Sequence, residues 1–228
     1  DRTDSGAQPA ATRPEGRPAV PRVGDPPALI AAALQARRLL LVGTAVPFPP
    51  EARPSGPPAL TVSRWQREAG SLPPFPWSIP QLPPVTLLSL DPSDRVEAAF
   101  RGAGVPLNVL RGRQDVVVRG QHNLIKLGGD LAARRGLLRT WAQVRDVPND
   151  ADKAHLLAEA EDVARDGVVL VIGDAPSDAF GRLWDALIRP SVGGAGHCLA
   201  LGPADARWPE GVRHVAEDVT GVLARLAE

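Results

Sequence analysis

The sequence predicts an α/β protein built on a doubly wound, mostly parallel, Rossmann-like sheet with helices on both faces. The first observation is Val168–Ile172, an unbroken run of apolar and mainly β-branched residues, which is typical of a strand buried on both faces. The second is that such runs alternate along the chain with segments of helical spacing. The third is that this run stops at Gly173 and leads through Asp-Ala-Pro-Ser-Asp into a helical pattern. In open α/β sheets, ligands bind at loops that leave the carboxyl ends of strands.

Short apolar runs that stop at turn-forming residues predict the strands. These are Leu39–Val42, Val85–Leu90, Leu107–Leu110, Val116–Val118, Asn123–Leu127, Val168–Ile172, His197–Leu201 and Val212–Val215. Apolar residues three and four apart predict the helices. These are Ala28–Arg38, a helix opened by Pro92 and Ser93 that runs through Phe100, Leu137–Val144, Ala151–Arg165, residues 177–188 and Val219–Leu226.

The ends and one internal segment differ in composition from the rest of the chain. Residues 1–26 have no apolar periodicity, which predicts a disordered tail or linker before an α/β domain over residues 27–228. Residues 47–84 hold 12 of the 25 prolines and predict a long loop inserted in the domain. We expect Trp65, Phe75 and Trp77 to hold this loop over the sheet.

Charge and cysteine content exclude several classes of protein. The 26 basic and 26 acidic residues balance, so we expect neither a nucleic-acid partner nor a membrane partner. Lys126 and Lys153 are the only lysines, and Cys198 is the only cysteine, which rules out an internal disulfide. No apolar run approaches the about 20 residues that span a bilayer, and no signal peptide is evident, so we expect a cytoplasmic protein. The chain begins at Asp1 rather than Met, as in a processed product or a piece of a longer chain.

Taken one at a time, the candidate chemical groups are weak signals. The turn Gly43-Thr44-Ala45 follows a strand and could bring backbone N–H groups to a phosphate, but it lacks the further glycines of a dinucleotide fingerprint. The histidines form no metal-ligand spacing, so no metal is expected, and surface or structural roles are favoured for His122, His155, His197 and His214. Ser177 lies in no nucleophile elbow. The acidic pairs Asp91/Asp94 and Asp174/Asp178 stand at helix starts, where capping explains them.

The order of the motifs is more informative than any one of them. In sequence they are Ala28–Val46, Leu88-Ser-Leu-Asp91, Lys126-Leu-Gly-Gly-Asp-Leu131, Leu138-Arg-Thr-Trp141, Val171-Ile-Gly-Asp-Ala-Pro-Ser-Asp178 and Gly211-Val-Arg-His-Val. In this order they resemble the bacterial sirtuin-like domains, the minimal NAD-fold relatives of the silent information regulator deacylases. The resemblance covers about residues 27–228.

The resemblance implies a site for NAD and no metal. The positions that it assigns to the cofactor are Gly43, Thr44, Ala45, Ser89, Gly128, Gly129, Gly173, Asp174, Ser177 and Asp178. The resemblance also assigns a catalytic role to Asp91 if the domain is active.

Several of these positions depart from the family pattern. Gly128 stands where the family has its general base, a His, and Gly cannot take a proton. Ser89 replaces the family's Asn, and Thr44-Ala45 replaces Ala-Gly. Asp174 replaces a frequent Tyr, and its carboxylate would repel the phosphates of a dinucleotide. The resemblance therefore implies a scaffold without the catalyst.

Three hypotheses remain open on the sequence. The first is a degenerate, catalytically inactive sirtuin-like domain that binds a nucleotide such as NAD or acts as a scaffold for a protein partner or fused domain in a bacterial defence or conflict system. The second is an active NAD hydrolase or deacylase with a rearranged site that uses Asp91. The third is an unrelated α/β interaction domain. The first two require that the loops at Gly43, Asp91, Gly128 and Gly173 converge.

Overall fold

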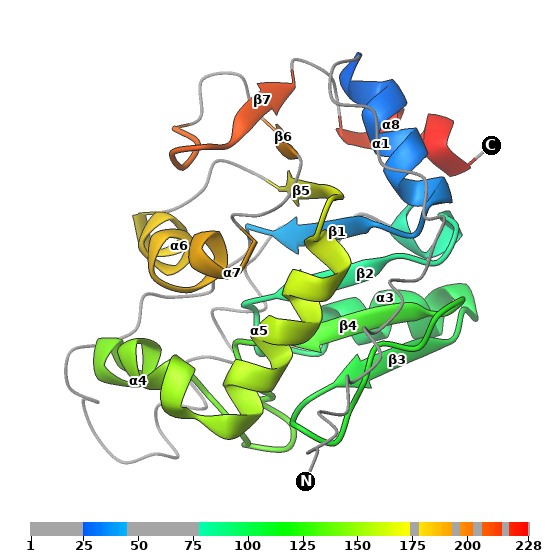
Figure 1. Cartoon of the computed structure of the whole chain (residues 1–228). Helices are drawn as coiled ribbons and strands as arrows, with labels where there is room; N and C mark the ends of the chain where they lie inside the picture. Colours follow the sequence, from blue (N-terminus) through cyan, green and yellow to red (C-terminus); the bar gives the residue numbers. More distant parts are fainter. Residues whose placement is uncertain are drawn as a thin grey trace, which may run out of the picture.

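The computed structural model describes residues 25–44, 78–173, 178–192, 197–202, 207–215 and 219–227. These residues form a seven-stranded sheet in the order β3-β4-β2-β1-β5-β6-β7, and every neighbouring pair is parallel (Figure 1). The strands are β1 (Leu39–Gly43), β2 (Thr86–Ser89), β3 (Leu107–Leu110), β4 (His122–Lys126), β5 (Val168–Ile172), β6 (His197–Leu201) and β7 (Arg213–Val215). The predicted parallel α/β fold is confirmed.

The centre of the sheet is formed by β1 and β5, the two most apolar strands. They pair along their whole length, from Leu39 opposite Val168 to Gly43 opposite Ile172. Side chains alternate between the two faces of a strand, and in both strands each face meets a hydrophobic core. This explains why the apolar run Val168–Ile172 has no polar break, since neither face of β5 reaches solvent.

Helices cover both faces of the sheet. One face packs against α4 (Trp141–Asp146), α5 (Ala151–Ala164), α6 (Asp178–Leu183), η3 (Trp184–Ile188) and α7 (Arg189–Val192). The other packs against α1 (Pro26–Gln35), η1 (Ile79–Gln81), α3 (Arg95–Ala103) and α8 (Val219–Ala227). In Figure 1, α5 crosses in front of the sheet and α3 lies behind it. The doubly wound arrangement is therefore as predicted.

The predicted strand at Val116–Val118 is wrong. Val116 is 56% exposed, and none of the three residues pairs with a neighbouring strand. The Val118 N–H donates to Asn123 Oδ1 at 2.8 Å, and the Val117 N–H donates to Glu159 Oε2 at 2.9 Å. Side chains therefore satisfy the backbone donors that a strand would have used.

Several predicted helices differ in extent or type. α1 ends at Gln35, and α3 begins at Arg95, after Pro92 and Ser93, and continues to Ala103. The helix predicted over Leu137–Val144 begins only at Trp141, because Thr140 and Gln143 form a capping box there. After a short turn, η2 (Val147–Asn149), α5 follows. The helix predicted over residues 177–188 runs from Asp178 as α6, but widens into a π-helical stretch over Trp184–Ile188 before α7.

Part of the predicted domain layout lies outside the described residues. This applies to most of the predicted tail, to residues 47–77 of the predicted loop, and to Trp65, Phe75 and Trp77. α1 begins at Pro26, two residues before the predicted start. Within 78–84, Ile79 is fully buried against the core on the α1 and α3 face. No described helix combines the length and the apolar character that crossing a membrane requires.

Candidate functional site

Four loops that the sequence singles out leave the same edge of the sheet, which we call the strand-end edge. They follow β1, β2, β4 and β5, which are parallel and adjacent, so their carboxyl ends lie side by side. The Thr44 N–H donates to the Ile172 carbonyl at 3.0 Å, and the Gly128 N–H donates to the Ser89 carbonyl at 3.2 Å. The loops at Gly43, Asp91, Gly128 and Gly173 therefore meet the geometric condition of the first two hypotheses.

The order in which strands are added to the sheet reverses at β1, although all of the strands are parallel. From β1 the chain moves to β2 on one side, whereas β5 lies on the other side of β1. Such a switch point opens a crevice at the carboxyl ends of the strands, where open α/β sheets bind ligands. Gly43 and Thr44 lie on one side of this point and Gly173 on the other.

The two sides of the switch point are in close contact. Gly173 has φ +140°, and a Cβ there would overlap Thr44 Oγ1, so only glycine fits. Among the described residues, a Cβ on Gly43 would meet nothing within 4 Å. Three predicted cofactor positions, Ala45, Asp174 and Ser177, lie outside the described residues, and Asp178 begins α6 with an exposed side chain.

Asp91 is buried at the strand-end edge and its carboxylate is fully engaged. Oδ1 accepts from the Ser93 N–H at 2.9 Å, Oδ2 accepts from the Ser93 hydroxyl at 2.8 Å, and Arg95 lies 3.5 Å away. Ser89 Oγ accepts from the Asp91 N–H at 3.1 Å. Asp91 therefore closes the turn that precedes α3 and does not cap the helix, and Asp94, at the N-cap position, makes no capping hydrogen bond and instead pairs with Arg101. The predicted capping of this helix by Asp91 and Asp94 is wrong.

The two glycines after β4 are required by packing. A Cβ on Gly128 would overlap the Leu90 carbonyl and lie 3.1 Å from Leu90 Cα. Gly129 has φ +98°, and its Cβ would lie 2.5 Å from the Gly136 carbonyl oxygen. Backbone therefore occupies the space that a side chain at either position would need.

None of the histidines, all four of which lie in the described ranges, bonds to a residue that the sequence assigns to the site. His122 lies at the amino end of β4, where it packs edge-on against Phe100, and burial lowers its pKa. His155 bonds to the Asp115 carbonyl, and His214 bonds to the Gly202 carbonyl. His197 begins β6, at the end away from the strand-end edge. His122 is therefore buried in the packed interior at the amino end of β4.

A network of charged side chains lies beneath the loops after β2 and β4. The fully buried Lys126 Nζ donates to the Ser93 carbonyl at 2.6 Å and to Glu97 Oε1 at 2.9 Å. Arg111 joins Glu97 to Asp130, with Nε 2.6 Å from Asp130 Oδ2. Burial alone would raise the pKa of Asp130, but hydrogen bonds from the Ala133 N–H and from Arg111 hold that pKa below its ordinary value.

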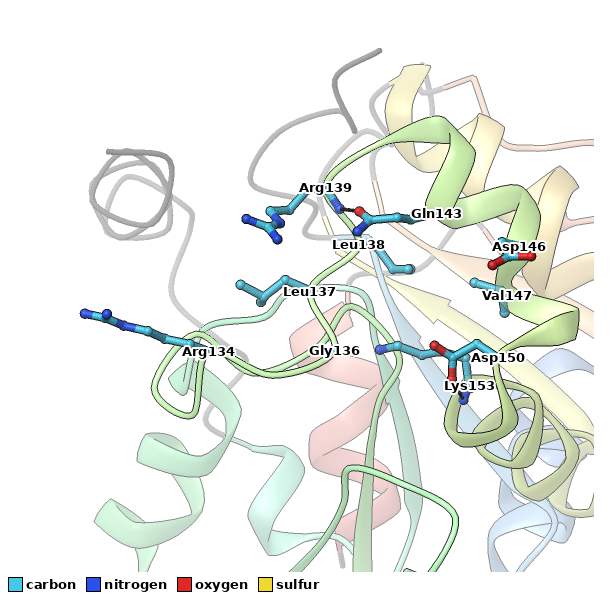
Figure 2. A pocket seen from close by; sticks show the side chains of 10 residues that line it. All are labelled: Arg134, Gly136, Leu137, Leu138, Arg139, Gln143, Asp146, Val147, Asp150 and Lys153. Carbon is cyan, nitrogen blue, oxygen red and sulfur yellow. Dashed lines mark hydrogen bonds between the residues drawn. The ribbon is translucent and has the colours of Figure 1, made fainter. Parts of the chain in front are cut away.

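A cavity of about 380 Å³ lies beside this edge, between the loop after β4 and the start of α5 (Figure 2). Among the described residues, its walls include Gly136, Leu137, Leu138, Val147 and Lys153. None of the residues that the sequence assigned to a site lines it. The periodicity of α5 gives no reason to single out Lys153, and the only signal in the sequence is the rarity of lysine.

Lys153 extends from the first turn of α5 toward Gly136. The side chain is 3% exposed, and Nζ donates to the Leu127 carbonyl at 2.5 Å. Burial lowers the pKa of Lys153 from 10.5 to about 8, although Asp150 and Asp152 act in the opposite direction. The amine therefore loses its proton much closer to neutral pH than an exposed lysine does.

The lowered pKa predicts a pH dependence of stability. Above pH 7, unfolded Lys153 keeps the proton that the folded side chain releases near pH 8, so the free energy of unfolding rises with pH. Relative to Lys153→Met, the wild-type protein should gain about 1 kcal/mol between pH 7 and pH 9. Urea unfolding of both proteins at the two pH values measures this gain. Equal pH slopes for the two proteins would contradict the lowered pKa.

Neither a metal site nor a comparison with known proteins assigns this chain to a family. Among the described residues, no three His, Cys, Asp or Glu side chains are grouped so that they could hold a metal ion. No family model matches the chain, and no curated protein matches it.

Proposed function

We propose that this chain is a catalytically inactive sirtuin-like domain that binds NAD or a related nucleotide at the switch point between β1 and β5. The observation that carries the proposal is the strand order, which brings Gly43 and Gly173 to opposite sides of that point. No described residue lies within 4 Å of a Cβ at Gly43, so the part of the chain that the structure describes leaves room for a ligand to approach the backbone there.

The absence of catalysis rests on two residues of the strand-end edge. Gly128, where the resemblance expects the general base, has no room for any side chain because the Leu90 carbonyl lies against it. The Asp91 carboxylate is held by Ser93 and Arg95, so it is not free to activate a water molecule.

The cellular role follows from the resemblance alone. On that basis we propose a binding or scaffold module in the cytoplasm that serves a protein partner or a fused domain in a bacterial defence or conflict system. A search for the protein partner should compare the domain with and without bound NAD.

An active NAD-consuming enzyme is the second candidate. It is favoured by the position of Asp91, whose loop leaves the same edge as Gly43 and Gly173. An active enzyme would release nicotinamide, and Asp91→Ala would abolish the release. The inactive domain binds NAD without releasing nicotinamide.

The deciding experiment combines NAD binding by calorimetry with an assay of nicotinamide release. We expect binding without release in the wild-type protein. Gly43→Glu should weaken binding at least about tenfold, equivalent to about 1.4 kcal/mol, because it adds a negative charge next to the expected pyrophosphate. The described part of the fold should tolerate this change, since no described residue lies within 4 Å of a Cβ at Gly43.

Val116→Glu is the matched control, because it adds the same charge at an exposed position in the segment between β3 and β4. We expect it to bind NAD like the wild-type protein. If Gly43→Glu bound NAD as tightly as the wild-type protein does, the nucleotide site would not lie at the switch point. No binding by the wild-type protein would favour the unrelated interaction domain.

A further inference from the structure

The two lysines of this chain are both buried, but among the described residues only Lys126 has an ion pair. Arginine supplies the other 24 basic residues, so lysine is rare and its two positions are distinctive. Lys126 has an ion pair with Glu97 at 2.9 Å. Lys153 donates to one carbonyl, that of Leu127, and has no ion pair with any described residue. An ammonium group has three donors, so Lys153 has hydrogen-bonding capacity to spare.

The surroundings of Lys153 disfavour a positive charge. It lies in the first turn of the 14-residue helix α5, where the helix dipole favours negative groups rather than cations. Asp150 is close by, but its Oδ1 accepts from the N–H groups of Asp152 and Lys153 as the helix cap. A buried charge of this kind calls for a partner.

The cavity against Lys153 has room for such a partner. Its volume of about 380 Å³ falls within the range of small-molecule sites, about 300–1,000 Å³. Leu137, Leu138 and Val147 give it apolar walls, and Arg139 lines it from the loop that precedes α4 (Figure 2). The charged groups around it are Arg134, Arg135 and Arg139 from that loop, Asp146 from α4, and Asp150 and Asp152 beside the amine.

Several of these charged groups are already engaged. Asp146 Oδ1 accepts from Asn149 Nδ2 at 3.1 Å, and Asp152 pairs with Arg135 at 3.4 Å. Arg134 points away from Lys153 in Figure 2. The described hydrogen bonds and ion pairs do not engage the guanidinium of Arg139, so positive charge remains available at Lys153 and Arg139.

We propose that this cavity binds a small carboxylate-bearing molecule, whose carboxylate accepts hydrogen bonds from the Lys153 ammonium group and whose apolar body packs on Leu137 and Leu138. Arg139 provides a second cationic contact for a dicarboxylate. This site is separate from the proposed nucleotide site, and neither depends on the other.

Binding should depend on pH in a defined way. The ligand binds the protonated amine, so the apparent affinity falls as Lys153 loses its proton near pH 8. From pH 7 to pH 9 the expected loss of affinity is about tenfold. Acetate, succinate, glutarate and benzoate keep their charge throughout this range, so the change reports on the protein.

The test is calorimetric titration of the full chain with acetate, succinate, glutarate and benzoate, and with neutral succinamide and inorganic phosphate for comparison. We expect at least one carboxylate to bind at pH 7, to bind about tenfold more weakly at pH 9, and not to bind Lys153→Met. Arg145→Met is the control, because Arg145 is exposed on α4 and does not line the cavity. It should bind as the wild-type protein does.

A second measurement needs no variant. Reductive methylation with formaldehyde and cyanoborohydride, followed by peptide mass spectrometry, reports on the two lysines separately. The bound carboxylate should protect Lys153 from methylation and leave the labelling of Lys126 unchanged. The proposal fails if no carboxylate of the series binds, if only phosphate or succinamide binds, or if protection does not differ between the two lysines.

Discussion

Gly128→Ala should destabilise the domain by about 3 kcal/mol or more, because the new methyl group has no space. A Cβ at this position would overlap the Leu90 carbonyl, which belongs to the backbone and cannot turn aside as a flexible side chain can. Relief requires that the loops after β2 and β4 separate, which would break the hydrogen bond from the Gly128 N–H to the Ser89 carbonyl. Chemical denaturation monitored by circular dichroism measures the loss.

Gly43→Ala is the matched control, because it makes the same change on the same edge at a position where no described residue lies within 4 Å of the new methyl group. We expect it to change the free energy of unfolding by less than about 1 kcal/mol. If the two variants were equally stable, the loops after β2 and β4 would be further apart than the structure has them. A histidine at position 128 would overlap the Leu90 carbonyl in the same way as the methyl group of Gly128→Ala. We therefore expect that Gly128→His does not restore a general base.

Lys126→Met should lower the free energy of unfolding by about 3–5 kcal/mol, because it removes one partner of a buried ion pair. The variant leaves the Glu97 carboxylate buried, with Arg111 as its nearest remaining cation at 3.6 Å. It also removes the donor to the Ser93 carbonyl, which ties the turn after β2 to β4. Urea unfolding at pH 7 measures the loss.

Lys153→Met serves as the comparison, since it removes the other buried lysine but breaks no ion pair. Lys153→Met should lower the free energy of unfolding clearly less than Lys126→Met does. Replacing Glu97 as well, in Lys126→Met/Glu97→Leu, should recover part of the loss, because no unpaired charge then remains buried. Equal losses for the two lysine variants would argue against the importance of the Glu97 pair.

The sequence was most informative where turn-forming residues delimit a short apolar run. Leu107–Leu110, Val168–Ile172 and His197–Leu201 are strands with the predicted bounds, because each is a short run that turn-forming residues delimit. The alternation of strands and helices then predicted the doubly wound sheet. Val116–Val118 has the same composition, but distant side chains, Asn123 and Glu159, compete for its backbone, and no local pattern reveals such partners.

The candidate site was predictable in position but not in detail. Strand ends share an edge in any parallel sheet, so the convergence of the loops at Gly43, Asp91, Gly128 and Gly173 follows from topology. The close contact of Gly128 with Leu90 depends on how two loops pack in space. The residues that line the cavity at Lys153 lie within residues 134–153, but they come from a loop, two short helical segments and the start of α5, so no single periodic pattern predicts the cavity.

The position of β1 at the centre of the sheet has a consequence for how the chain folds. One of its neighbours, β2, follows it in sequence, but Leu40 also pairs with Val169, more than half of the chain later. During synthesis, one hydrogen-bonding edge of β1 therefore stays exposed until β5 has left the ribosome. Such distant pairing slows folding, and an open apolar edge can recruit strands from other chains. We expect fragments that end before Val168 to aggregate.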